Sequence, residues 1–158
     1  MTKNNSVKND ELLYRRVNDN DDKHNDRHIS DEQGNLKWIN RICFHDDKKN
    51  ISVFRASLMN FKPHLCRKSV VQGVVGFTAG EIRSIEIQGY KVKVCAKPDN
   101  TVSCKHNSDE YFRRIAHALI FLICIDSNPP SAKRAYRGLQ QELKTKSLKR
   151  GWLVKPHS

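Results

Sequence analysis

The sequence lacks the features that mark a secreted, disulfide-bonded protein or a membrane protein. Its five cysteines are an odd number and form no C-x-x-C pair, so we expect no disulfide framework and a reducing compartment. The first sixteen residues contain no apolar h-region of a secretion signal. The longest apolar run, Ile115–Ile125, has eleven residues and is too short to cross a bilayer. These absences predict a cytoplasmic protein with no membrane partner.

Motifs of the common enzyme classes are also missing. The chain has no G-x-S-x-G nucleophile elbow, no Walker loop and no G-x-G-x-x-G fingerprint. Arg113 and Arg114 precede His117 too closely for the Arg–His pair of one metal-independent RNase class. No Glu-x-Lys follows Pro98-Asp99, as a two-metal nuclease would need. On balance we expect a binding protein rather than an enzyme, and no cofactor.

Two groups of residues contain metal-ligating side chains, but neither has the paired short spacings of a structural zinc site. In the first group, His24, Asp26 and His28 alternate within a polar segment. The second group consists of Cys95, Cys104, His106 and His117. We predict that neither group binds a metal.

Acidic residues are scarce toward the C-terminus. The whole chain has 29 Lys and Arg against 17 Asp and Glu, a formal net charge of +12. Residues 129–158 hold eight basic side chains and one acidic one, whereas residues 1–33 have a balance of −2. Clustered Lys and Arg favour a polyanion, because each neutralised phosphate releases a condensed counterion. DNA or RNA is the expected partner; charge alone leaves open an acidic protein, an anionic membrane or mere solubility.

The basic segment has the pattern of an amphipathic helix. Residues 129–130 are both proline and mark a boundary. The apolar residues that follow recur at spacings of four, three and four, which places them on one stripe of a helix: Ala132, Tyr136, Leu139 and Leu143. We expect a helix from about Ser131 to Lys146, with Gly151 ending it and residues 152–154 folding back on the core.

The basic side chains of this segment are the candidate phosphate contacts. They are Lys133, Arg134, Arg137, Lys144, Lys146, Lys149 and Arg150. Affinity from such contacts falls steeply with salt concentration. The alternative is a solvated face whose apolar stripe docks on this domain or on a partner.

Residues 12–128 predict an α+β core. Short segments of strand composition alternate with short helical patterns, without the long crossover helices of a doubly wound sheet. Thr78 and Glu81 have capping-box spacing and open a predicted helix from Ala79 to about Ile87. Periodicity cannot separate helix from strand in residues 117–125, whose composition favours a central strand.

The expected fold is a small mixed or antiparallel sheet with a few short helices and the basic amphipathic C-terminal helix. Residues 1–11 are polar and predict a mobile N-terminus. Residues 18–34 hold few apolar side chains and predict a long polar surface loop. Residues 129–158 form the basic C-terminal helix and tail.

Four polar residues lie on or beside predicted strands: Arg15, Arg16, Arg55 and His117. If those strands are neighbours, the four side chains would form a basic pocket suited to a phosphate or a nucleotide. The sequence does not establish which strands are adjacent.

Four sequence blocks, in order, resemble a family of small, uncharacterised bacterial proteins. The blocks are residues 12–17 (LLYRRV), 52–55 (SVFR), 73–81 (GVVGFTAGE) and 117–120 (HALI). The resemblance covers about residues 12–125 and implies no activity. It implies a bacterial source, and it places the basic C-terminal helix outside the shared region.

Charge and resemblance together predict a nucleic-acid-binding accessory module of a larger bacterial assembly, one concerned with antiviral defence or mobile DNA. One alternative is a protein-interaction subunit that docks on a larger enzyme through its C-terminal helix. The other is a small enzyme that acts on nucleotides or RNA, centred on His117.

Overall fold

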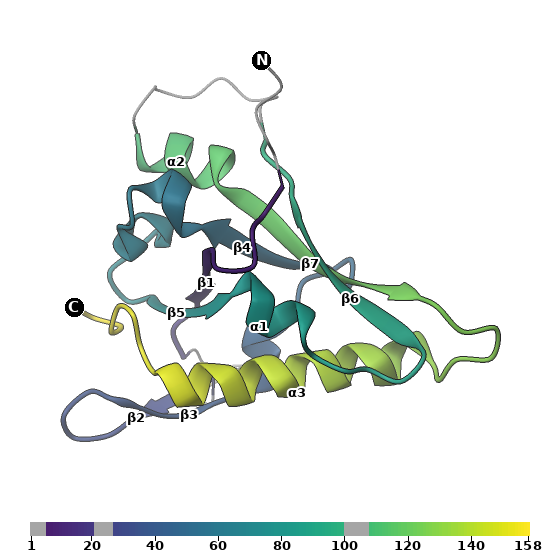
Figure 1. The fold of residues 1–158 in the computed structure, drawn as a ribbon. Coiled ribbons are helices and arrows are strands. Elements are labelled where there is room, and N and C mark those ends of the chain that lie inside the picture. Colours follow the sequence, from purple (N-terminus) through teal and green to yellow (C-terminus); the bar gives the residue numbers. More distant parts are fainter. Residues whose placement is uncertain (1–5, 21–26, 100–107) are drawn as a thin grey trace, which may run out of the picture.

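The centre of the protein is a five-stranded antiparallel sheet, seen in a computed structural model that describes residues 6–20, 27–99 and 108–158 (Figure 1). Its strands have the order β5-β1-β4-β7-β6. They are β1 (Leu12–Val17), β4 (Ile51–Arg55), β5 (Gly73–Thr78), β6 (Tyr90–Ala96) and β7 (His117–Cys124). A separate hairpin pairs β2 (His28–Ser30) with β3 (Leu36–Ile39). The predicted α+β class is confirmed, and the sheet is antiparallel throughout.

Helices cover both faces of this sheet. The α-helices are α1 (Ala79–Arg83), α2 (Asp109–Ile115) and α3 (Ala132–Arg150). The short 3-10 helices are η1 (Arg41–Phe44), η2 (Ala56–Met59) and η3 (Pro63–Cys66). One core cluster joins α1 and α3 to one face, and a second cluster joins α2, η2 and η3 to the other. The alternation of strand side chains produces this division, because neighbouring residues of a strand point to opposite faces.

Strand register decides which polar residues share a face. Phe54 of β4 pairs with Tyr14 of β1 and with His117 of β7, so these three positions lie on the α2 side. Arg16 and Ser52, two residues along from Tyr14 and Phe54, lie on the same side by the same alternation. The opposite side faces α3.

Local signals in the sequence explain the two short helices. The hydroxyl oxygen of Thr78 accepts from the Glu81 N–H at 3.1 Å, and the Glu81 carboxylate accepts from the Thr78 N–H at 3.4 Å. The predicted capping box is therefore present, but α1 ends at Arg83 rather than Ile87. The apolar run that begins at His117 forms β7, as its composition favours.

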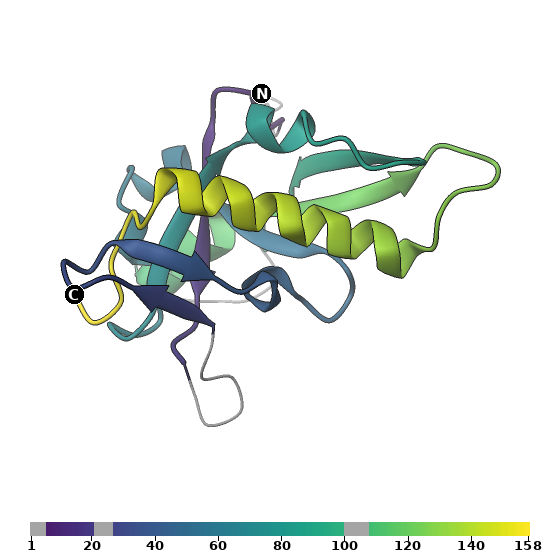
Figure 2. The same ribbon diagram turned by 90° about the horizontal axis from the view of Figure 1, so that it is seen from below.

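The C-terminal helix is longer than predicted. It continues past Lys146 to Arg150, and Gly151 ends it with a φ of 78°, a conformation that favours glycine. Figure 2 shows α3 lying across the molecule beside the β2–β3 hairpin. Beyond the helix, Val154 forms an isolated antiparallel bridge with Val74, so the predicted fold-back of the tail is confirmed.

Two segments differ from their expectations. Val7 is buried and its carbonyl accepts from the Arg83 guanidinium, so residues 6–11 pack on α1; residues 1–5 lie outside the described residues. The polar segment 18–34 contains β2, whose His28 is buried with its ring edge against Trp152. Val7 anchors the N-terminal segment and His28 anchors the polar segment. The polar composition of these segments does not indicate that one residue of each is buried.

Candidate nucleic-acid interface

Helix α3 is fixed on the sheet by its apolar side. Leu139 and Leu143 are fully buried, and Tyr136 is 5% exposed. The Tyr136 hydroxyl and the Gln140 side-chain amide both donate to the carbonyl of Phe44, each at 3.2 Å. These contacts set the rotation of the helix about its axis and leave its other side in solvent.

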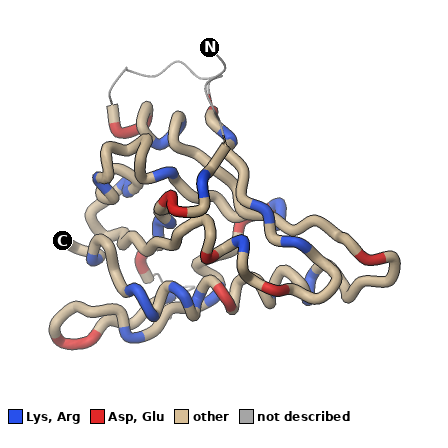
Figure 3. The backbone as a smooth tube through the Cα atoms, in the orientation of Figure 1, with Lys and Arg blue, Asp and Glu red and all other residues tan. Residues whose placement is uncertain are grey.

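Three basic side chains occupy the solvent side of the first two turns. Lys133, Arg134 and Arg137 are all exposed. Within residues 6–20, 27–99 and 108–158, none of their side chains forms a hydrogen bond or an ion pair. Blue segments recur along α3 in Figure 3, and Glu142 is the sole acidic residue in the helix sequence. This end of α3 presents positive charge that no described residue neutralises.

The other predicted phosphate contacts fall in different surroundings. Lys144 lies on the same side as Lys133 and Arg137 by helical spacing, and its Nζ is 4.9 Å from the centroid of the Trp38 ring. Arg150 forms an ion pair with the Glu81 carboxylate of α1 at 2.5 Å. Lys146 is half-buried and lies on the same side of α3 as Arg150, four residues before it. Lys149 is exposed. The seven residues therefore do not form one surface, and the four nearest the start of the helix form the compact group.

Arg15 and Arg55 have structural partners. Arg15 is buried and donates to the Asp46 carboxylate at 2.9 Å, and to the carbonyls of Cys43 and Ser52. Arg55 donates to Glu11 at 2.7 Å in a separate part of the molecule. Burial alone would raise the pKa values of Asp46 and Glu11, but the charge and hydrogen bonds of the paired arginines hold them below the usual range. The predicted four-residue pocket is therefore divided.

Arg16 and His117, the remaining two, do line one cleft of about 340 Å³. Lys68 and Arg113 line it as well, together with Ser52. The sequence analysis did not assign Lys68 or Arg113 to a site, because no local pattern links η3 and α2 to the strands. Only the fold brings these charges together.

No protein-family model, no curated protein and no solved structure matches this chain. The resemblance of its sequence blocks to a bacterial family thus receives no support from these comparisons. No helix of the described residues is long and apolar enough to cross a membrane. Function must be inferred from the geometry of the molecule.

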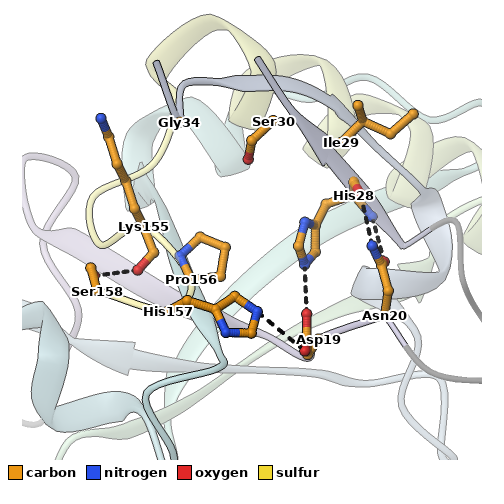
Figure 4. Close-up of a pocket in the computed structure, with 10 residues that line it drawn as sticks. All are labelled: Asp19, Asn20, His28, Ile29, Ser30, Gly34, Lys155, Pro156, His157 and Ser158. Carbon is orange, nitrogen blue, oxygen red and sulfur yellow. Dashed lines mark hydrogen bonds and ion pairs between the residues drawn. The ribbon is translucent and has the colours of Figure 1, made fainter. Parts of the chain in front are cut away.

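A cavity of about 560 Å³ lies between the β2–β3 hairpin and the C-terminal tail (Figure 4). Asp19 stands between two histidines: its carboxylate is 3.8 Å from His28 Nε2 and 3.3 Å from His157 Nε2. The described part of the chain contains no group of three side chains suited to hold a metal ion. The sequence analysis named two groups of metal-ligating side chains and predicted that neither binds a metal. Four of their residues lie outside the described residues: His24, Asp26, Cys104 and His106.

The buried ring of His28 makes stability depend on pH. Burial lowers its pKa below 6.5, and His157 and Arg27 act in the same direction, although Asp19 opposes them. As pH falls through 6.5, the unfolded chain takes up a proton that the folded state resists, so the free energy of unfolding declines. We expect His28→Phe to flatten the dependence of the urea midpoint on pH between 7.5 and 5.

His64→Gln is the matched control, because His64 is an exposed histidine of η3. It should retain the wild-type dependence on pH. The phenylalanine variant also loses no hydrogen bond at this position, since His28 Nε2 is buried without a hydrogen-bond partner among the described residues. An unchanged slope in His28→Phe would show that other groups cause the acid sensitivity.

Proposed function

We propose that this protein binds DNA or RNA through the solvent side of α3, as an accessory module of a larger bacterial assembly concerned with defence or mobile DNA. The observation that carries the binding proposal is the exposed group Lys133, Arg134 and Arg137, whose side chains pair with no described residue. These side chains extend from a helix that is anchored in the core. The helix therefore holds them in position for contact with the phosphate backbone of a nucleic acid. The sequence resemblance alone suggests the bacterial setting.

Charge pairing elsewhere in the molecule supports this proposal. Arg15, Arg55, Arg114 and Arg150 each contact a carboxylate, whereas the basic side chains at the start of α3 contact none in the described regions. From Lys133 to Lys144 the helix rises about 16 Å. Each DNA strand carries one phosphate per about 3.4 Å of helix axis, so this group can contact several phosphates.

The docking alternative receives less support from the packing. Its simplest form requires the apolar stripe of α3 to bind a partner enzyme. Leu139 and Leu143 are already buried on the protein's own sheet, so a partner would have to bind the polar side. That side matches a polyanion better than it matches an apolar groove.

Replacing Arg134 with glutamate is expected to raise stability while it weakens nucleic acid binding. The Ser131 hydroxyl accepts from the Arg134 N–H at 3.2 Å, so a glutamate at this third helical position completes a capping box. The first turn of α3 has no acidic residue, and the new charge would complement the helix dipole. We expect a gain of about 0.5–1 kcal/mol in urea unfolding and a loss of about tenfold or more in affinity.

Fluorescence anisotropy with labelled single-stranded DNA, duplex DNA and RNA measures the affinity. Arg134→Ala is the control, because it removes the charge without supplying a side-chain acceptor for the Ser131 N–H; it should weaken binding with little gain in stability. Wild-type affinity in Arg134→Glu, or no binding by the wild-type protein at low salt, would overturn the proposal.

A further inference from the structure

A second basic site lies on the opposite face of the sheet from α3. The cleft of about 340 Å³ is bounded by the strands β1, β4 and β7 and by α2. Arg16, Ser52 and His117 line it from the strands, Lys68 from the segment after η3, and Arg113 from α2. The sheet brings together residues that are up to about a hundred positions apart in the sequence.

Two arginines of the cleft have no carboxylate partner in the described parts of the chain. Arg16 Nη1 donates to the Cys66 carbonyl at 3.3 Å, and Arg113 Nη1 donates to the carbonyls of Leu65 and Arg67 at 3.1 and 3.0 Å. These bonds occupy one end of each guanidinium and leave further N–H donors. Partly buried charges without a counter-ion are unfavourable, so an anion between the two arginines would stabilise both.

The electrostatic state of Arg16 agrees with this geometry. Burial lowers its pKa, and the positive charges of Arg15 and Arg113 lower it further. Asp46, whose negative charge acts on Arg16 in the opposite direction, is already bound to Arg15 by hydrogen bonds at 2.9 and 3.2 Å. The cleft therefore concentrates positive charge around Arg16 that Asp46 offsets only in part.

His117 and Ser52 supply hydrogen-bonding groups to the lining of the cleft. His117 Nδ1 lies 2.8 Å from the Lys97 carbonyl, which can only accept, so Nδ1 carries a hydrogen. His117 Nε2 lies 3.1 Å from the Ser52 hydroxyl. With the Nδ1 contact, this hydrogen bond fixes the orientation of the His117 ring and of the Ser52 hydroxyl.

We propose that this cleft binds a phosphate monoester, with Arg16, Lys68 and Arg113 as its charged ligands. This inference goes beyond the proposed function, because the cleft and α3 lie on opposite faces of the sheet. Arg114, at the rim, is held by Asp99 at 3.0 Å and Glu110 at 2.6 Å and takes no part.

Charge favours a monoester over a backbone diester. The lining has four basic side chains and two carboxylates, which leaves two positive charges. A phosphate monoester carries about −1.5 to −2 at pH 7, whereas each backbone phosphate of a nucleic acid carries −1. A 5′-mononucleotide, free phosphate and the phosphorylated end of a strand share this chemistry.

Isothermal titration of the full chain with inorganic phosphate, AMP and adenosine tests the site. We expect phosphate and AMP to bind, adenosine not to bind, and dimethyl phosphate to bind at least several-fold more weakly than phosphate. A 5′-phosphorylated oligonucleotide compared with its unphosphorylated form shows whether a strand end is accepted. Absence of phosphate and AMP binding at millimolar concentration would overturn the proposal.

Variants localise the binding. Lys68→Gln should weaken AMP binding about fivefold or more, and Arg16→Gln should weaken it more than tenfold. Lys62→Gln is the matched control, because Lys62 is an exposed lysine at the other end of η3 that does not line the cleft. Lys68 is exposed and its variant should fold normally, so the test stands even if Arg16→Gln does not fold.

The two proposals can fail separately. Replacing Lys133, Arg134 and Arg137 with glutamine should leave AMP affinity unchanged, because α3 does not line the cleft. Wild-type AMP affinity in both Lys68→Gln and Arg16→Gln would overturn the cleft proposal, whatever happens to nucleic acid binding.

Discussion

Replacing Arg15 with methionine is expected to destabilise the protein by about 3 kcal/mol. Arg15 is 9% exposed, and its guanidinium donates to the Asp46 carboxylate and to the carbonyls of Cys43 and Ser52. Removal of the arginine leaves a partly buried carboxylate without its counter-charge, although the Ser52 N–H still donates to it at 2.7 Å, and it takes a donor from each of two carbonyls. This costs more than the pair itself contributes. Urea denaturation at pH 7 measures the change in the free energy of unfolding.

Asp46 determines how this loss varies with pH and with a second substitution. Its pKa is held below 3.8, so the pair stabilises the folded state above that pH, and the contribution is lost as pH falls through the lowered pKa. Adding Asp46→Asn to the Arg15 variant should recover part of the loss, because the unpaired charge is gone. A loss below about 1 kcal/mol in Arg15→Met would show that water replaces the arginine easily.

The triple variant Lys133→Gln/Arg134→Gln/Arg137→Gln is expected to bind nucleic acid about 100-fold more weakly at 50 mM salt, because three phosphate contacts are lost together. All three side chains are exposed and make no hydrogen bond or ion pair in the described structure, so the fold should be retained. Fluorescence anisotropy measures the affinity, and the urea midpoint checks the fold.

A matched variant removes the same number of charges outside α3. Lys8, Lys62 and Lys91 are exposed and lie on the N-terminal segment, before η3 and on β6. Their triple replacement by glutamine lowers the net charge equally, and we expect less than a threefold change in affinity. Equal losses in the two triple variants would show that net charge, and not the α3 surface, controls binding.

Local patterns in the sequence predicted the elements that depend on local physics. The spacing of Tyr136, Leu139 and Leu143 identified the buried side of α3, although Ala132, the first residue of the predicted stripe, is exposed. Thr78 with Glu81 identified the start of α1. The end of α3 was placed too early, since residues 147–150 continue the helix without a breaker before Gly151. Such signals operate over a few residues and can be read without the fold.

The partners of the arginines could not be predicted in this way. Arg15 pairs with Asp46 and Arg55 with Glu11, which are 31 and 44 residues away in sequence. Nothing near Arg15, Arg16 or Arg55 distinguishes a paired arginine from an unpaired one. Strand order decided the outcome, and it left Arg16 beside Arg113 with His117 in one cleft.

The slope of log K against log salt concentration tests the central claim most directly. It should be measured with the same labelled oligonucleotide for the wild-type protein and for the α3 triple variant, between about 50 and 200 mM salt. If α3 contacts phosphates, the wild-type slope is steep and the variant slope is shallower by about 2 to 3, one lost contact per substituted residue. Equal slopes in the two proteins would contradict the account.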